Sequence, residues 1–305
     1  MNESKAKISG NIGGAFILLA GILWGTMGVF VKKLTHSGFS SAEVSAGRWF
    51  FSALIIVAAV YLHDKKNLII ERRDIFRFAL IGIFGFLLTS TFLYLGISFT
   101  SIAVADVLMY TSPIWVQIAS VVFFKERLNL RKIICIVLTF LGCVLASGIK
   151  VADNSKISIP GIIFGLSAGI CYASYSITAS FMLKKYNEIT VTAYSTLFAG
   201  LGSIFTVNVK RVASTISVDF ESIIYILIIA ICCTVIPYFL YTVGVKRNGP
   251  TTAAILSCAE PVTATLISVF IAKEQLSFFQ AIGIICIILA IVLLKARLDY
   301  FRRRV

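Results

Sequence analysis

Residues 105–126 read ADVLMYTSPIWVQIASVVFFKE, and residues 253–274 read AAILSCAEPVTATLISVFIAKE. Each stretch has a proline at its ninth position, a serine seven residues later and a lysine–glutamate pair at its end. Equivalent residues of the two stretches lie 148 positions apart. The same offset relates further identical residues: Gly13 and Gly161, Phe16 and Phe164, Leu18 and Leu166, Ala20 and Ala168, Gly21 and Gly169, Ile22 and Ile170, Gly96 and Gly244. The sequence therefore consists of one unit written twice.

The composition indicates a membrane protein. The chain is 58% hydrophobic and 14% charged, with a mean hydropathy of +0.94. Its charges lie between apolar runs of about twenty residues, a length that crosses a bilayer as a helix. The runs are 12–31, 42–62, 75–97, 101–124, 132–149, 159–183, 190–209, 220–244, 250–271 and 278–296. Backbone groups in lipid must be paired internally, and continuous apolar runs favour helices over a β-barrel. We therefore expect an all-α polytopic membrane protein with ten transmembrane helices.

The repeat predicts how the two halves are oriented. Each half holds five apolar runs, in residues 12–149 and 159–296. An odd number of crossings inserts the second copy upside down, so we expect two inverted five-helix repeats. Secondary transporters use this construction.

The basic residues predict the topology. The net charge is +14. With the N-terminus in the cytoplasm, 20 of the 28 basic residues fall in cytoplasmic segments, 7 in outer segments, and Arg48 lies within a run. This bias predicts a multi-pass protein of the cell membrane with both termini cytoplasmic. It also explains the basic composition without a nucleic-acid partner.

The two stretches quoted above resemble the EamA-type branch of the drug/metabolite transporter superfamily. In both, a helix rich in small residues carries a central proline, and a glutamate follows thirteen residues later. The pair Glu260–Pro261 is also typical of that family, and the resemblance covers the whole chain. It implies efflux or exchange of small metabolites, often amino acids. The symmetry is imperfect, since Thr196 is the mate of Arg48 and Ser112 is the mate of Glu260.

Three prolines stand well inside the runs: Pro113, Pro237 and Pro261. A proline within a helix frees a carbonyl group and kinks the helix. Pro113 and Pro261 are repeat mates, so we expect symmetry-related kinks beside a cavity between the halves. A kink that only serves packing is the alternative.

Three ionisable residues lie deep in the runs, where such groups are costly and often functional. Arg48 and Asp106 fall at similar depth, which predicts an ion pair for coupling or, alternatively, a static structural pair. Glu260 lies near the membrane midplane with no basic residue at its depth in the sequence. It is the candidate for binding a cationic substrate or a coupling proton, and a packing role is the alternative.

Aromatic and polar residues supply further candidates for substrate binding: Trp24, Tyr110, Gln117, Tyr172, Tyr175 and Ser257. Aromatic rings and a carboxylate suit a cation. A role in the core or at the membrane interface is the alternative for each aromatic residue. Glycines at four-residue spacing around Gly21 and Gly169 predict close packing of the first and sixth helices. Glu126 and Glu274 are expected to have structural roles, as caps or as partners of a neighbouring base.

The sequence thus favours a secondary transporter, exporter or exchanger, of small organic metabolites by alternating access. A passive facilitator or channel is the alternative. No G-x-x-x-x-G-K-[ST] motif is present, and the two histidines, His36 and His63, lie in predicted loops, so neither ATP hydrolysis nor enzyme catalysis is expected. We expect no cofactor and no metal. The expected partners are a small-molecule substrate, the lipid bilayer and protons, and the expected state is a monomer.

Overall fold

The computed structural model describes residues 3–127, 129–148, 158–207, 221–271, 273 and 275–301, with side chains for those between 10 and 294. Helices account for nearly all of these residues. They are α1 (Glu3–Gly25), α2 (Met27–His36), α3 (Ser41–His63), η1 (Lys65–Leu68), α4 (Arg72–Leu80), η2 (Ile81–Leu88), α5 (Thr89–Phe99), α6 (Ile102–Met109), α7 (Ser112–Phe124), α8 (Leu130–Ala146), α9 (Ile159–Met182), α10 (Glu188–Ser203), η3 (Ile204–Thr206), α12 (Glu221–Ala230), η4 (Ile231–Val235), α13 (Ile236–Asn248), α14 (Pro250–Ser257), α15 (Ala259–Phe270) and α16 (Phe278–Phe301).

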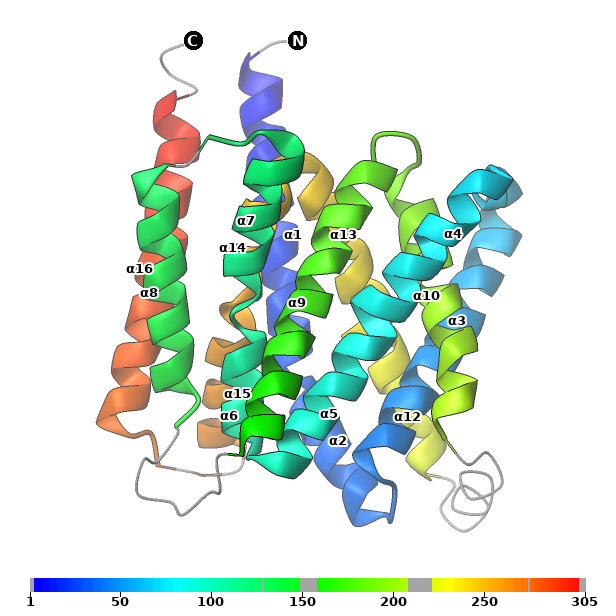
Figure 1. Ribbon diagram of the computed structural model, residues 1–305, viewed down its shortest axis with the longest axis horizontal. Coiled ribbons are helices and arrows are strands. Elements are labelled where there is room, and N and C mark those ends of the chain that lie inside the picture. Colours follow the sequence, from blue (N-terminus) through cyan, green and yellow to red (C-terminus); the bar gives the residue numbers. More distant parts are fainter. Residues whose placement is uncertain are drawn as a thin grey trace.

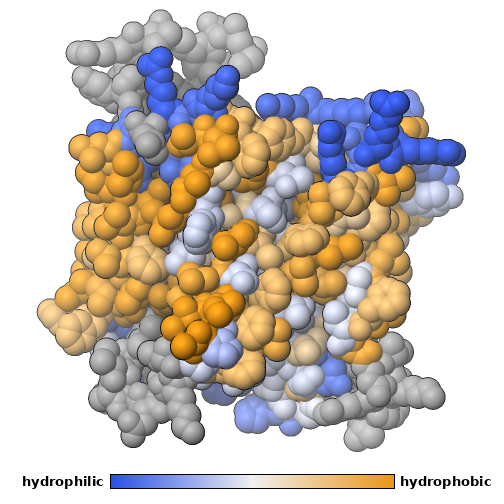
Figure 2. All heavy atoms as spheres, in the orientation of Figure 1, coloured by the Kyte–Doolittle hydropathy of each residue, from blue (hydrophilic) through white to orange (hydrophobic). Residues whose placement is uncertain are grey.

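The described residues include eight helical stretches that are long and apolar enough to cross a membrane. Two further helices fall just below that length: α8 has 17 residues, and the apolar part of α16, Phe278–Leu294, has 17 as well. Large apolar side chains such as Leu54 and Phe84 are exposed on the outside of the bundle. Figure 2 shows hydrophobic residues over the middle of the visible face, with hydrophilic residues towards its two ends. A soluble surface would not expose so continuous an apolar band.

The two ends of the chain lie at the same end of the bundle (Figure 1), which we call the terminal face; the other end is the opposite face. Helix α1 runs away from the terminal face, whereas α9, its equivalent in the second half, runs towards it (Figure 1). The helices α8 and α16 pack along each other at one side of the bundle, and α3 packs along α10. The central helices are α1, which packs on α13 and α15, and α9, which packs on α5 and α6.

The helices are interrupted where the prolines stand. Pro113 and Pro261 lie in the first turns of α7 and α15, directly after breaks at residues 110–111 and 258. Pro237 lies at the start of α13, after the π-helical segment η4. A proline cannot donate to the carbonyl group four residues earlier and its ring clashes with it, so each helix breaks just before its proline. A second π-helical segment, η2, interrupts the third span without a proline.

Two glycines allow helices to lie against these breaks. A Cβ atom on Gly21 of α1 would stand 2.9 Å from the carbonyl oxygen of Ser257, and one on Gly169 of α9 would stand 2.8 Å from Oγ1 of Thr111. The prediction that these glycine faces pack the first and sixth helices against each other is therefore wrong. They pack α1 against α14–α15 and α9 against α6–α7, because the broken helices supply the close backbone approach.

Some sequence predictions fall outside the described residues. These are the connection at 149–157 and Glu274. The expected pairing of Glu126 with a base is confirmed, because its carboxylate pairs with Lys132. It also accepts a hydrogen bond of 3.0 Å from the Thr251 hydroxyl, which ties α7 to the start of α14.

Candidate functional site

Aromatic rings from three central helices meet around Trp24 of α1. The ring centroid of Trp24 lies 5.0 Å from that of Tyr238, 5.6 Å from that of Tyr241 and 6.4 Å from that of Tyr172. The Trp24 indole is largely buried, and its N–H has no hydrogen-bond partner among the described residues. A buried N–H of this kind usually finds a partner, so it remains available to a bound molecule.

The hydroxyl groups of two tyrosines, Tyr241 of this cluster and its neighbour Tyr175, form hydrogen bonds within the protein. Tyr175 is fully buried, and its hydroxyl lies 2.6 Å from Oγ1 of Thr242. The hydroxyl of Tyr241 lies 2.7 Å from Oγ of Ser176. These pairs join α9 to α13. Tyr175, a predicted binding residue, therefore packs within the core and stacks on Tyr241.

The two carboxylates of the central helices face a common region. Asp106 of α6 and Arg48 of α3 both lie close enough to Glu260 for their charges to act on its carboxylate. Tyr110 lies within the field of both carboxylates. Both carboxylates are partly exposed, and neither makes a side-chain hydrogen bond or ion pair with a described residue. Because its neighbours come from α3 and α6, Glu260 points into the bundle rather than towards lipid.

Arg48 has partners other than the one predicted. Its guanidinium donates to Oγ of Ser90 at 2.9 Å, contacts Sδ of Met27 at 2.9 Å, and lies 4.6 Å from the ring centroid of Trp49. No ion pair joins it to Asp106 in the described part of the chain, so the predicted pair is not formed. Depth along a helix does not fix which way a side chain faces, and α3 presents Arg48 to α2 and α5. From the sequence, no basic residue is expected at the depth of Glu260. In the structure, Arg48 is close enough to Glu260 for its charge to act on that carboxylate.

The remaining predicted residues are divided between the site and its surroundings. Ser257, at the end of α14, lies beside the hydroxyl of Tyr172. Tyr110 stands at the break between α6 and α7 and packs on Cys143 and Cys258. Gln117 is 5% exposed on α7, and neither atom of its amide has a partner among the described residues. It is not one of the residues that meet around Trp24.

Polar contacts join the two halves at the terminal face. Asp74 of α4 accepts hydrogen bonds from Lys185 at 2.6 Å and from the Tyr186 hydroxyl at 2.7 Å, and Glu71 pairs with Lys185 at 2.5 Å. Together Glu71, Asp74, Lys185 and Tyr186 form what we call the terminal-face cluster. The hydrogen bond from Thr251 to Glu126 adds a second link at the same face.

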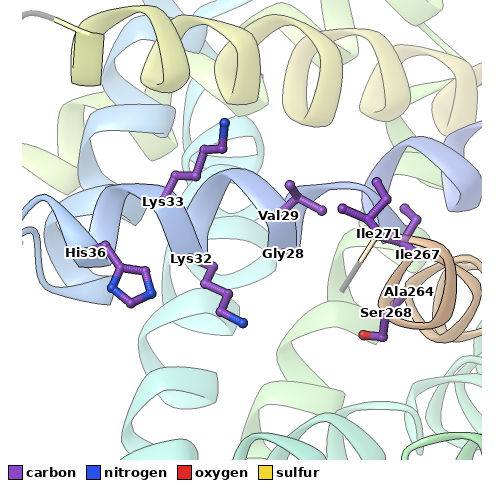
Figure 3. Close-up of a pocket in the computed structure, with 10 residues that line it drawn as sticks. Gly28, Val29, Lys32, Lys33, His36, Ala264, Ile267, Ser268 and Ile271 are labelled. Carbon is purple, nitrogen blue, oxygen red and sulfur yellow. The ribbon is translucent and has the colours of Figure 1, made fainter. Parts of the chain in front are cut away.

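Two pockets lie near the ends of the bundle. A groove of about 510 Å³ at the opposite face is lined by Gly25, Gly28, Val29, Lys32, Lys33, His36, Ala264, Ile267, Ser268 and Ile271 (Figure 3). A smaller pocket of about 240 Å³ at the terminal face includes Ser180 and Lys184, the repeat mates of Lys32 and His36. Within the described residues, no group of three or more His, Cys, Asp or Glu side chains is arranged to hold a metal ion.

Comparison with known proteins agrees with this architecture. A sequence profile of the EamA-like transporter family matches residues 11–148 and again residues 159–296. The chain belongs to the EamA-like transporter family.

Relatives of this EamA-family chain are themselves transporters without an assigned substrate. An uncharacterized inner membrane transporter, YicL, of Salmonella typhimurium is 24% identical over 94% of this chain and 95% of its own length. An uncharacterized transporter of Archaeoglobus fulgidus is 27% identical over 89% of this chain and 92% of its own, and the uncharacterized transporter YcbK of Bacillus subtilis is 23% identical over 92% of each. A solved crystal structure at 17% identity covers 98% of this chain and 99% of its own with a TM-score of 0.76, which shows a shared fold. The protein is accordingly a multi-pass membrane protein of the EamA-like transporter family.

Several residues of the central region in this EamA-family protein were not among the sequence candidates. Tyr238 lies between Trp24 and Trp49, at 5.0 and 5.4 Å, and Phe86 lies 4.3 Å from Tyr238. Ser90 holds Arg48. The available signal was the position of Tyr238 directly after Pro237. Phe86 and Ser90 carry no such signal, because the π-helical segment η2 that turns them inward has no proline.

Proposed function

We propose that this protein is a secondary transporter that moves small cationic or zwitterionic organic metabolites, amino acids among them, by alternating access. The single observation that carries the proposal is that two carboxylates within the spans, Glu260 of α15 and Asp106 of α6, are partly exposed and make no side-chain hydrogen bond or ion pair with a described residue. An ionised carboxylate in a membrane interior needs a positive charge to offset it. A substrate ammonium group or a proton can supply it.

The ten helices are proposed to cross the membrane as two inverted five-helix repeats, at residues 12–149 and 159–296. Local features that recur 148 positions apart support this. The helix breaks include residues 110 and 258, π-helical turns occur at 81–88 and 231–235, and Lys125 and Lys273 have φ angles of 53° and 54°. The opposite directions of α1 and α9 in Figure 1 fit an inverted arrangement.

The terminal face is proposed to be cytoplasmic, in the cell membrane. Lys65, Arg72, Lys185 and Lys246 lie in segments at that end, which is consistent with the positive-inside rule. The chain is proposed to act as a monomer, since the central region draws its residues from both halves of one chain.

The substrate site is proposed to lie between Trp24, Tyr172 and the two carboxylates. An ammonium group would sit against Glu260 and Asp106, and the ring faces of Trp24 and Tyr172 would add cation–π attraction. The free indole N–H of Trp24 offers a donor to a substrate carboxylate or hydroxyl. The hydroxyl of Ser257 donates to the Ala254 carbonyl oxygen, so its oxygen offers an acceptor to a substrate hydroxyl or ammonium group.

Alternating access is proposed to use the interrupted helices. The terminal-face cluster and the link from Thr251 to Glu126 hold that face closed, so in this conformation the site would be reached from the opposite face. Opening the terminal face requires these contacts to break while α6–α7 and α14–α15 bend at residues 110–111 and 258. Packed elements with two discrete arrangements are the usual basis of such switching.

The experiment is transport in proteoliposomes that contain the purified protein, assayed against a panel of amino acids and other small amines with and without a proton gradient. A secondary transporter accumulates one member above its external concentration when the gradient is present. Equilibration without accumulation under every gradient would instead identify a facilitator. Failure to move any cationic or zwitterionic compound while anionic ones are moved would contradict the proposed substrate class.

A further inference from the structure

The groove at the opposite face opens because the first span is interrupted. Helix α1 ends at Gly25, and Thr26 separates it from α2. Beyond this break, α2 packs on α12 and α3 instead of continuing along α15. Gly28 lies in the gap, and a Cβ atom there would meet nothing within 4 Å. In the second half, α9 continues without a break, and the related pocket at the terminal face has less than half the volume.

The helices that line the groove indicate that it opens towards the surrounding membrane. Its walls are the end of α1, α2 and α15, and no residue of the central helices α6, α9 or α13 lines it. A space enclosed by the bundle would be lined by several of these helices. The groove is thus a feature of the perimeter, and its inner end, at Gly25, reaches the backbone of Glu260.

The lining changes from apolar to cationic along the groove. Val29, Ile267 and Ile271 form the apolar part, and Lys32 and His36 stand at the end next to the membrane surface. Lys32 and His36 project to the same side of α2 (Figure 3). They follow Val29 by about one and two helical turns, so the cationic end lies roughly 5–10 Å beyond the apolar part.

Lys32 and His36 are available to a ligand. The described residues offer neither of them a side-chain hydrogen bond or ion pair, and Lys32 is engaged only through its carbonyl oxygen. Lys33, by contrast, turns to the other side and donates to the Tyr225 hydroxyl at 3.2 Å. Basic residues are also scarce on this side of the membrane, where the proposed topology places only 7 of the 28. Lys32 is therefore not there as part of the cytoplasmic charge bias.

We propose that this groove binds an anionic phospholipid from the leaflet at the opposite face. The lipid phosphate accepts hydrogen bonds from the Lys32 ammonium and the His36 imidazole. One acyl chain lies over Gly28 against Val29, Ile267 and Ile271. A phospholipid fits both parts of the groove, because its anionic head lies at the membrane surface and its acyl chain lies at hydrocarbon depth. A choline headgroup would bring a cation towards Lys32, so phosphatidylcholine binds less well than phosphatidylglycerol.

The test is native mass spectrometry of the full-length protein in detergent with dioleoyl phosphatidylglycerol or dioleoyl phosphatidylcholine as the probe. Phosphatidylglycerol is expected to bind the unchanged protein more tightly. Lys32→Gln is expected to weaken it roughly fivefold, the effect of one basic residue at an anionic membrane surface. His36→Gln removes the imidazole hydrogen bond and is expected to weaken it less. A Cβ atom at Gly28 would meet nothing within 4 Å, so Gly28→Leu is expected to fill the groove and remove the bound lipid. Lys65→Gln, an equal charge change at the terminal face, is the control and is expected to leave binding unchanged.

Size-exclusion chromatography and thermal unfolding show whether each variant is folded. If Gly28→Leu does not fold, the result for Lys32→Gln decides the test. Equal affinity for the two lipids, or unchanged phosphatidylglycerol binding in both Lys32→Gln and Gly28→Leu, overturns the proposal. Displacement of the lipid by millimolar glycerol phosphate also overturns it, because the groove would then bind the phosphate alone. Binding is measured without transport, so a failure here leaves the proposed function untouched.

Discussion

Nζ of Lys185 lies 2.6 Å from Oδ2 of Asp74, and this ion pair joins the two halves of the chain at the terminal face. The Asp74 side chain is only 2% exposed, whereas that of Lys185 is 38% exposed. Tyr186 and Arg77 donate to the same carboxylate, so Asp74 is the centre of the terminal-face cluster. A buried carboxylate with three donors is costly to disturb, because removing it leaves its partners unpaired.

Replacing Asp74 with alanine is expected to lower the free energy of unfolding by roughly 2 kcal/mol, the usual scale for a hydrogen bond to a charged group. It should also loosen the closed terminal face. Thermal unfolding in detergent measures the first effect, and alkylation of a cysteine placed at Ser180, in the terminal-face pocket, measures the second. Arg77→Gln removes only the exposed partner and is expected to change stability by less than about 1 kcal/mol. Equal effects of the two substitutions would show that Asp74 is not the centre of the cluster.

The same cluster gives a prediction for pH. Asp74 and then Glu71 raise the pKa of the Lys185 ammonium above its usual value of 10.5. A base with a raised pKa in the folded state stabilises the protein fully below its unfolded pKa and loses that contribution as pH rises through the folded one. The contribution of Lys185 should therefore be constant from about pH 6 to about pH 9 and decline only above about pH 10.5.

This can be measured as the difference in melting temperature between the unchanged protein and Lys185→Met across that range. A difference that already shrinks between neutral pH and about pH 9 would mean that the ammonium is not held by the carboxylates.

The sequence predicts the helices and the repeat well because both depend on local properties, hydropathy over a window and identity at a fixed offset. It does not predict the break at Thr26 or the π-helical segment η2, since neither has a proline. It also fails for Arg48, where depth in the membrane suggested Asp106 but packing of α3 presents the guanidinium to Ser90. Rotation of a helix about its axis is set by contacts between distant segments, so the candidate site could be predicted by residue type and depth, whereas its pairings could not.

Double-mutant cycles can test the pairing of Arg48. We expect Arg48→Gln and Ser90→Ala to be coupled by roughly 0.5–3 kcal/mol, as residues in direct contact are. Arg48→Gln and Asp106→Asn should be closer to additive, because no ion pair joins them. Unfolding of the four proteins of each cycle in detergent gives both values. A larger coupling for Arg48 with Asp106 than with Ser90 would restore the pair that the sequence suggested.

The glycines of the first span offer a matched pair of substitutions. Gly21→Ala places a methyl group 2.9 Å from the Ser257 carbonyl oxygen, so we expect a loss of roughly 1–3 kcal/mol from overpacking. Gly28→Ala meets nothing within 4 Å and should be neutral or stabilise the helix by up to about 1 kcal/mol. Melting temperatures of the two variants should therefore move in opposite directions or differ clearly. Identical effects would argue against close packing of α1 on the break between α14 and α15.

The last prediction concerns Glu260 and the proposed transport site. Glu260→Gln retains size and hydrogen-bonding capacity but removes the charge that faces Asp106. Transport of a cationic substrate should fall at least tenfold, because the substrate ammonium group loses its charged partner, and a tenfold loss of binding corresponds to about 1.4 kcal/mol. Folding should be preserved, since no described residue makes a hydrogen bond or ion pair with the Glu260 carboxylate. Glu188→Gln is the control, because Glu188 pairs with Lys246 at 3.1 Å at the terminal face, away from the carboxylate pair. Uptake into proteoliposomes at several pH values measures both variants. If Glu260→Gln keeps the rate and the pH profile of the unchanged protein, the carboxylate has no part in transport, and Trp24 and Tyr172 become the groups to test next.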